Sequence, residues 1–64
     1  MSIQERRKII DDIMKNLPVG TIIAVDFPNV GFNLRKEKNG YSWVGKDRHH
    51  KKEGYSYEVV SQPL

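Results

Sequence analysis

Asn39 and Gly40 stand next to each other between two stretches in which apolar and polar residues alternate. An Asn-Gly pair favours a two-residue β-hairpin turn, because both residues tolerate positive φ. Folding the chain there predicts three cross-strand pairs: Lys38 with Tyr41, Lys36 with Trp43, and Leu34 with Gly45. The same folding gathers four apolar side chains on one face: Phe32, Leu34, Tyr41 and Trp43. Because turn and apolar pattern agree, residues 32–38 and 41–45 are predicted to form a hairpin.

The N-terminal segment predicts a helix over about residues 3–16. Ser2 is a favourable N-cap residue, and Glu5 follows three positions later, which is the spacing of a capping box. An apolar stripe recurs at helical spacing: Ile9, Ile10, Ile13, Met14 and Leu17. Pro18 disfavours helical geometry at the residue before it, so we expect the helix to stop near Leu17.

Two further strands are predicted, over residues 21–27 and 55–60, since β-branched and aromatic residues alternate there with polar ones. The expected fold class is α+β, with one N-terminal helix packed on a three- or four-stranded antiparallel meander sheet. We expect the helix to cover one apolar face of that sheet: Ile23, Val25, Phe27, Leu34, Trp43 and Tyr57. In the alternative arrangement, the strands curl into a small barrel with the helix at one end.

The chain of 64 residues has room for a single domain, residues 1–64. It contains no cysteine, so no disulfide supports its small core, and self-association into a homo-oligomer is one way to gain stability. No apolar run approaches the ~20 residues of a membrane-spanning helix. Asp11 and Asp12 interrupt the N-terminal segment where a secretory signal would be apolar. We therefore expect a cytoplasmic protein without a membrane partner.

The residues offer little support for catalysis. His49 and His50 are the two histidines, and they are adjacent in the most polar segment of the chain. Two neighbouring loop side chains fall short of the three or four ligands of a transition-metal site. The paired carboxylates Asp11 and Asp12 point about 100° apart on a helix and cannot act on one bond. Each glycine is isolated, so no phosphate-binding loop is present. The sequence thus predicts a protein that is not an enzyme and has no catalytic residue, metal or cofactor.

Residues 45–54 contain no apolar side chain and predict an exposed basic loop. Its cationic and imidazole side chains form the candidate binding site for nucleic acid or an acidic partner: Lys46, Arg48, His49, His50, Lys51 and Lys52. Four aromatic residues on the flanking strands would stack on bases if they faced solvent: Tyr41, Trp43, Tyr55 and Tyr57. The same residues are expected in the core, however, and a net charge of +3 is low for a dedicated nucleic-acid binder. A purely solvated loop is the other interpretation.

The run Leu17-Pro18-Val19-Gly20-Thr21-Ile22-Ile23, together with Tyr41-Ser42-Trp43-Val44, resembles small accessory proteins encoded by bacteriophages. The resemblance covers about residues 17–45, and it implies a protein without catalytic function that binds a host protein or nucleic acid. The leading hypothesis from the sequence is a small non-enzymatic protein-binding module, which could dock its partner by strand addition at a sheet edge. The alternative is nucleic-acid binding through residues 46–52 of the basic loop.

Overall fold

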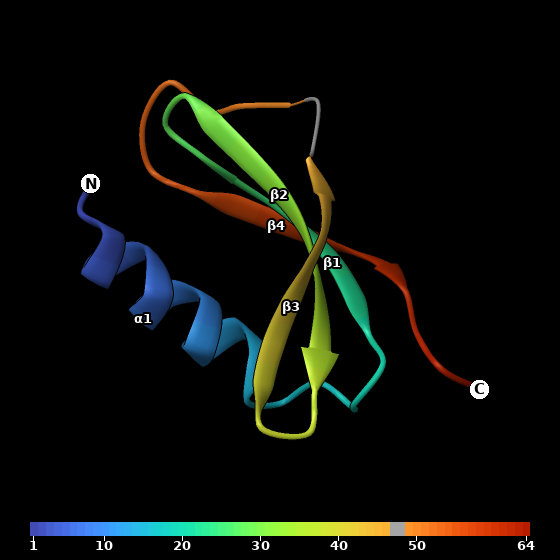
Figure 1. Ribbon diagram of the computed structural model, residues 1–64. Coiled ribbons are helices and arrows are strands. Elements are labelled where there is room, and N and C mark those ends of the chain that lie inside the picture. The colour runs from blue at the N-terminus through green and yellow to red at the C-terminus, as the bar shows by residue number, and fades with distance from the viewer. Residues whose placement is uncertain (47–48) are drawn as a thin grey trace.

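The computed structural model describes residues 1–46 and 49–64, in which one helix lies on a four-stranded antiparallel sheet (Figure 1). The elements in chain order are α1 (Ile3–Met14), β1 (Ile22–Phe27), β2 (Val30–Glu37), β3 (Gly40–Lys46) and β4 (Ser56–Ser61). The predicted α+β architecture is confirmed, and each strand lies within two residues of its expected bounds. No helix in the described ranges combines the length and apolarity needed to cross a bilayer.

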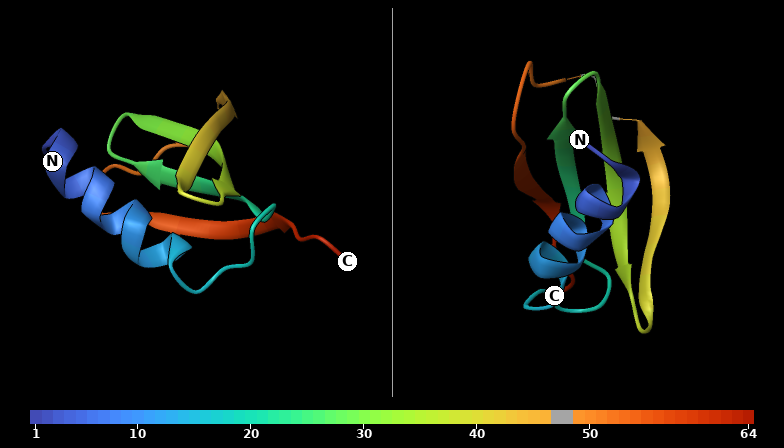
Figure 2. Two further views of the ribbon diagram at one scale, coloured as in Figure 1. Left: turned by 60° about the horizontal axis from the view of Figure 1, so that its bottom comes forward. Right: turned by 90° about the vertical axis from the view of Figure 1, so that its left-hand side faces the viewer.

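The strand order in the sheet is β3-β2-β1-β4. Strands β1, β2 and β3 form the expected meander, whereas β4 pairs with β1 at the opposite side of the sheet. This is the order of a Greek key, in which the fourth strand returns to lie beside the first. Among the described strands, β3 and β4 are therefore the two edges of an open sheet, and the alternative of a closed barrel is wrong (Figure 2).

Helix α1 begins with the predicted capping box. The Glu5 amide donates to Ser2 Oγ at 3.1 Å, and the Ser2 amide donates to Glu5 Oε1 at 3.5 Å. The helix ends at Met14, two residues earlier than predicted. The Met14 carbonyl accepts two hydrogen bonds there, one from the Leu17 amide at 3.0 Å and one from the Lys36 ammonium group of β2. Lys36 thus places a positive charge at the helix C-terminus, where the helix dipole favours it.

Two tight turns connect the meander strands. In the first, Asn29 adopts φ 65°, and Phe27 pairs directly with Val30. In the second, the loop residues are Lys38 and Asn39, and Glu37 pairs with Gly40. The predicted hairpin is therefore present, but its predicted register is wrong by two residues: Leu34 lies opposite Trp43 and Lys36 opposite Tyr41.

The expected turn requires a positive φ at both Asn39 and Gly40. In the structure only Gly40 of this pair has a positive φ (144°), so the turn and with it the register differ. Beyond the bulge at Val44, Gly45 lies opposite Asn33, so the register there differs by one residue. Between the turn and the bulge the register differs by two residues, which leaves the facing of the side chains unchanged because side chains alternate with a period of two. Phe32, Leu34, Tyr41 and Trp43 therefore still share the face of the sheet that carries α1.

The core lies between α1 and the middle of the sheet. Its buried apolar residues come from three elements: Ile10, Ile13 and Met14 of α1, Ile23, Val25 and Phe27 of β1, and Leu34 of β2. The expected burial of Trp43 and Tyr57 is wrong, because their exposed fractions are 61% and 47%. Four strands spaced by roughly 4.8 Å form a layer wider than one helix of about 10 Å diameter can cover. The edge strands β3 and β4 consequently keep their large side chains in contact with solvent.

We expect Lys36→Met to lower the free energy of unfolding by about 1–2 kcal/mol, because it removes the charged donor to the Met14 carbonyl and keeps the aliphatic stem. Urea unfolding measures this difference. Lys38→Met is the matched control: Lys38 is exposed in the neighbouring turn, and its loss is expected to change stability by less than about 0.5 kcal/mol. Equal effects of both substitutions would contradict a role for Lys36 at the helix terminus.

Candidate functional site

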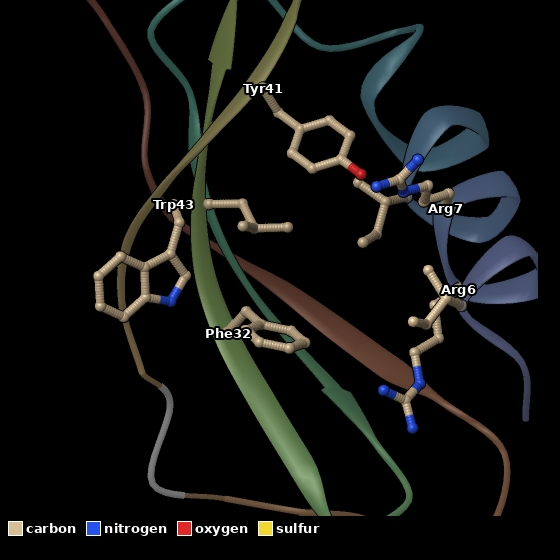
Figure 3. Close-up of a pocket in the computed structure, with 8 residues that line it drawn as sticks. Arg6, Arg7, Phe32, Tyr41 and Trp43 are labelled. Atoms are coloured by element: carbon tan, nitrogen blue, oxygen red, sulfur yellow. The ribbon is translucent and has the colours of Figure 1, made fainter.

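An open groove lies between the N-terminal half of α1 and strands β2 and β3 (Figure 3). Its volume is about 340 Å³, near the lower end of the range for ligand sites. Eight residues line it: Ile3, Arg6, Arg7, Ile10, Phe32, Leu34, Tyr41 and Trp43. The floor is apolar, and the polar groups are two guanidinium groups, one phenol and the indole N–H of Trp43. This volume is enough for one or two large side chains of a partner.

Two adjacent arginines form the helix wall of the groove. Arg6 is half-buried, and its guanidinium carbon lies 5.8 Å from the centre of the Phe27 ring, a cation–π distance. Its Nε atom is buried and makes no hydrogen bond to any described residue. Within the described ranges, neither Arg6 nor Arg7 is in ion-pair contact with a carboxylate. The groove therefore combines an apolar floor with two cations that no described anion neutralises.

Trp43 and Tyr41 form the opposite wall, on β3. Figure 3 shows the Tyr41 hydroxyl pointing toward the Arg7 guanidinium group. Burial raises the pKa of the Tyr41 phenol, the nearby Asp11 carboxylate raises it further, and Arg7 opposes the increase. Tyr41 thus remains a neutral hydrogen-bonding group at neutral pH, and the stability that depends on its protonated form is lost only above the ordinary phenol pKa of about 10.

The basic loop predicted over residues 45–54 begins later than expected, because Gly45 and Lys46 are the end of β3 and Gly45 is half-buried. The predicted site residues that are described are exposed: Lys46, His49, His50, Lys51 and Lys52. Arg48, the sixth predicted site residue, lies outside the described residues, as does Asp47. The backbone of Lys51 is held against the β1–β2 turn, since its amide donates to the Phe27 carbonyl at 3.3 Å and its carbonyl accepts from the Asn29 amide at 3.4 Å. The part of the loop around Lys51 therefore crosses the end of the sheet before the chain reaches β4 (Figure 1).

The four aromatic residues that flank this loop do not form one platform. Tyr41 and Trp43 lie on β3, whereas Tyr57 lies on β4 with Tyr55 immediately before it, and strands β2 and β1 separate the two pairs. Tyr55 instead approaches Phe27, with ring centres 6.4 Å apart. A single row of stacked bases therefore cannot contact all four rings.

Interpretation of the sequence alone missed the arginines of the groove. Neither Arg6 nor Arg7 was among the residues predicted to bind. The signal was nevertheless present, because Ile3, Arg6, Arg7 and Ile10 follow the spacing i, i+3, i+4, i+7 of a single helix face. The opposite wall of the groove, formed by Tyr41 and Trp43 on β3, depends on the strand order and register of the sheet, which the helical spacing does not predict.

No described residue makes a hydrogen bond to either imidazole of His49 or His50 in the loop. Among the described side chains, no group of three or more His, Asp or Glu lies close enough together to hold a metal ion. Comparison of the chain with protein-family models, curated proteins and solved structures found no match. The groove and the basic loop are therefore the features from which a function must be argued.

We expect Trp43→Ala to lower the free energy of unfolding by at most about 1 kcal/mol, because most of the indole is already in contact with water. Phe27→Ala is the comparison, since Phe27 is fully buried and its truncation is expected to cost about 3–5 kcal/mol. Thermal and urea unfolding of both variants measure the difference. Comparable losses would show that Trp43 supports the core and is not a free surface residue.

Proposed function

We propose that this chain is a small, non-enzymatic protein-binding module that receives an apolar side chain of its partner in the groove between α1 and β3. The observation that carries the proposal is the exposed indole of Trp43 beside an apolar floor flanked by Arg6 and Arg7. Trp, Tyr and Arg are the residues most enriched where truncation weakens protein–protein contacts. All three types line this groove, together with aliphatic side chains that exclude water.

The charges favour an acidic partner segment. Arg6 and Arg7 have no carboxylate partner among the described residues, and a carboxylate from outside would form charge-assisted hydrogen bonds with them. The buried Nε of Arg6 gains most from such a partner, because a buried donor without an acceptor is costly. The proposed ligand is thus a protein segment in which an apolar side chain lies next to Asp or Glu. The resemblance to phage accessory proteins supports a host protein as its source.

Affinity capture from a bacterial lysate tests the proposal. The wild-type chain is expected to retain a discrete, stoichiometric protein, and Trp43→Ala is expected to lose it. Val44→Ala is the matched control, since Val44 is the next residue of β3, is 42% exposed and does not line the groove. Retention by both variants would place the partner elsewhere, and capture of no protein by the wild type would refute a protein-binding role.

The acidic character of the partner is tested with the captured complex. Arg7→Ala should weaken binding roughly ten- to a hundredfold, as expected for one charge-assisted hydrogen bond. Lys8→Ala removes the same charge from the adjacent exposed residue, which does not line the groove, and should leave affinity nearly unchanged. Equal losses would indicate general electrostatic attraction and not recognition in the groove.

Nucleic-acid binding through the basic loop is the second candidate. The observation that favours it is that Trp43 is exposed on β3, the strand that leads into the exposed cations of the loop. A protruding ring and neighbouring positive charges are the two parts of a single-strand binding surface. The separation of the β3 and β4 aromatics limits such a surface to Tyr41 and Trp43.

This candidate predicts that a single-stranded oligonucleotide quenches Trp43 fluorescence at low salt and is released as salt is raised. Combining Arg48→Ala, Lys51→Ala and Lys52→Ala should weaken binding and flatten the salt dependence. A control that removes three cations elsewhere, Lys8→Ala with Lys15→Ala and Lys38→Ala, should have a smaller effect. Absence of any mobility shift at low salt would eliminate nucleic-acid binding.

A further inference from the structure

Strand β4 is an edge strand whose outward side carries no described partner. It pairs with β1 alone, through Val59 opposite Ile23 and Tyr57 opposite Val25. These pairs place Tyr57 and Val59 on the face of the sheet that carries α1, yet Tyr57 is 47% and Val59 41% exposed. Tyr55, two residues before Tyr57, is exposed as well. In Figure 2, α1 crosses the sheet while β4 runs along its outer margin.

This edge lacks the features that usually protect edge strands from pairing with another chain. Such edges carry lysine, proline, bulges or charged side chains that point inward. Glu58 is the one charged side chain in residues 54–64, and Pro63 lies beyond the strand. The bulge of β4 comes only at Val60, since Ile22 pairs with Ser61 and Ile23 with Val59. The opposite edge strand, β3, ends in Lys46 and is interrupted by a bulge at Val44.

We propose that β4 pairs with β4 of a second copy of this chain, antiparallel and centred on Tyr57. A second copy fits better than a charged partner because the edge offers almost no charge to recognise. It also fits because the strand complements itself in this register. Tyr57 lies opposite Tyr57, Tyr55 opposite Val59, and Glu58 opposite Ser56. Aromatic and aromatic–β-branched pairs of this kind are the ones that stabilise neighbouring strands.

The other registers are less favourable. Each possible register has one residue at its centre, opposite its own copy, and moving this centre by one residue shifts the pairing by two residues. A shift by an odd number would place side chains from different faces of the sheet opposite each other. Centring the pair on Ser56 would place Glu58 opposite Gly54, which lies before the strand and has a φ of 74°. Centring the pair on Glu58 would place two carboxylates directly opposite each other, which is destabilising. Centring it on Val59 would bring the bulge at Val60 into the new ladder and interrupt it. The register on Tyr57 keeps the bulge outside the paired segment and separates the two carboxylates.

The resulting dimer has one continuous sheet. The two β4 strands are related by a two-fold axis perpendicular to the sheet, so both copies of α1 lie on the same side of it. Because each copy uses the same surface in the contact, the assembly stops at a dimer and does not grow into a filament. The rows formed by Tyr57 and Val59 of the two copies meet over the new ladder and shelter each other from water. The groove between α1 and β3 remains open in each copy, because it lies at the far edge of the sheet.

Sedimentation velocity from micromolar to millimolar concentration tests the association. We expect a reversible monomer–dimer equilibrium, and Val59→Lys should raise the dimer dissociation constant by roughly tenfold or more. Val44→Lys is the matched control: it places the same charge at the other edge of the sheet, at a valine of nearly equal exposure (42%). A chain that stays monomeric throughout, or a dimer that Val44→Lys disrupts and Val59→Lys does not, would overturn the proposal.

Single cysteines test the register, since the chain has none of its own. Only a residue on the two-fold axis faces its own copy, at a Cα separation of about 4.5–5.5 Å that a disulfide can bridge. Tyr57→Cys is therefore expected to form a covalent dimer under mild oxidation, whereas Glu58→Cys and Val59→Cys are not. Efficient cross-linking by either of the latter, in place of Tyr57→Cys, would refute pairing centred on Tyr57.

Discussion

The burial of β1 beneath α1 is the contact on which the other features depend. Ile23, Val25 and Phe27 have no exposed surface, because β2 and β4 flank them and Ile10, Ile13 and Met14 cover them. A chain of this length has one core, and at roughly 1.5–3 kcal/mol per fully buried large side chain this layer supplies most of the hydrophobic stabilisation. The strand that follows the helix in sequence thus becomes the centre of the sheet.

This arrangement also explains where the molecule has surface available for binding. A single helix covers the two central strands and leaves both edge strands partly open. Trp43 on β3 and Tyr57 on β4 consequently face solvent on the same side of the sheet, at opposite margins. Apolar side chains that a second helix would cover in a larger domain are here available for intermolecular contact.

The two margins differ in charge, and this difference separates the two proposed contacts. The β3 side has Arg6 and Arg7 across the groove, so it suits a partner that brings a carboxylate. Strand β4 has Glu58 as its one charged side chain, in keeping with the proposed pairing with a copy of itself. The ammonium group of Lys36 on β2 donates to the Met14 carbonyl and thereby ties the C-terminal end of α1 to β2.

Local signals in the sequence determined the elements of this protein. The capping box at Ser2 and Glu5, the apolar stripe of the helix and the Gly40 turn act over a few residues, so helix and strands could be predicted closely. The exposure of the basic loop also followed from its lack of apolar residues, wherever the loop is described. The arginine wall was partly encoded, in the helical spacing of Ile3, Arg6 and Ile10.

Only the tertiary structure decided the order of the strands, the register of the hairpin and the exposure of the edge aromatics. Strand order depends on where a long connection returns to the sheet, which local patterns do not specify. Alternation predicted correctly which face carries Trp43, but burial depends on whether another element lies above that face. One helix is narrower than four strands, so it covers the central strands and leaves the edge strands open. Burial could therefore be predicted for Val25 and Phe27 on the central strand β1, but not for Trp43 and Tyr57 on the edge strands.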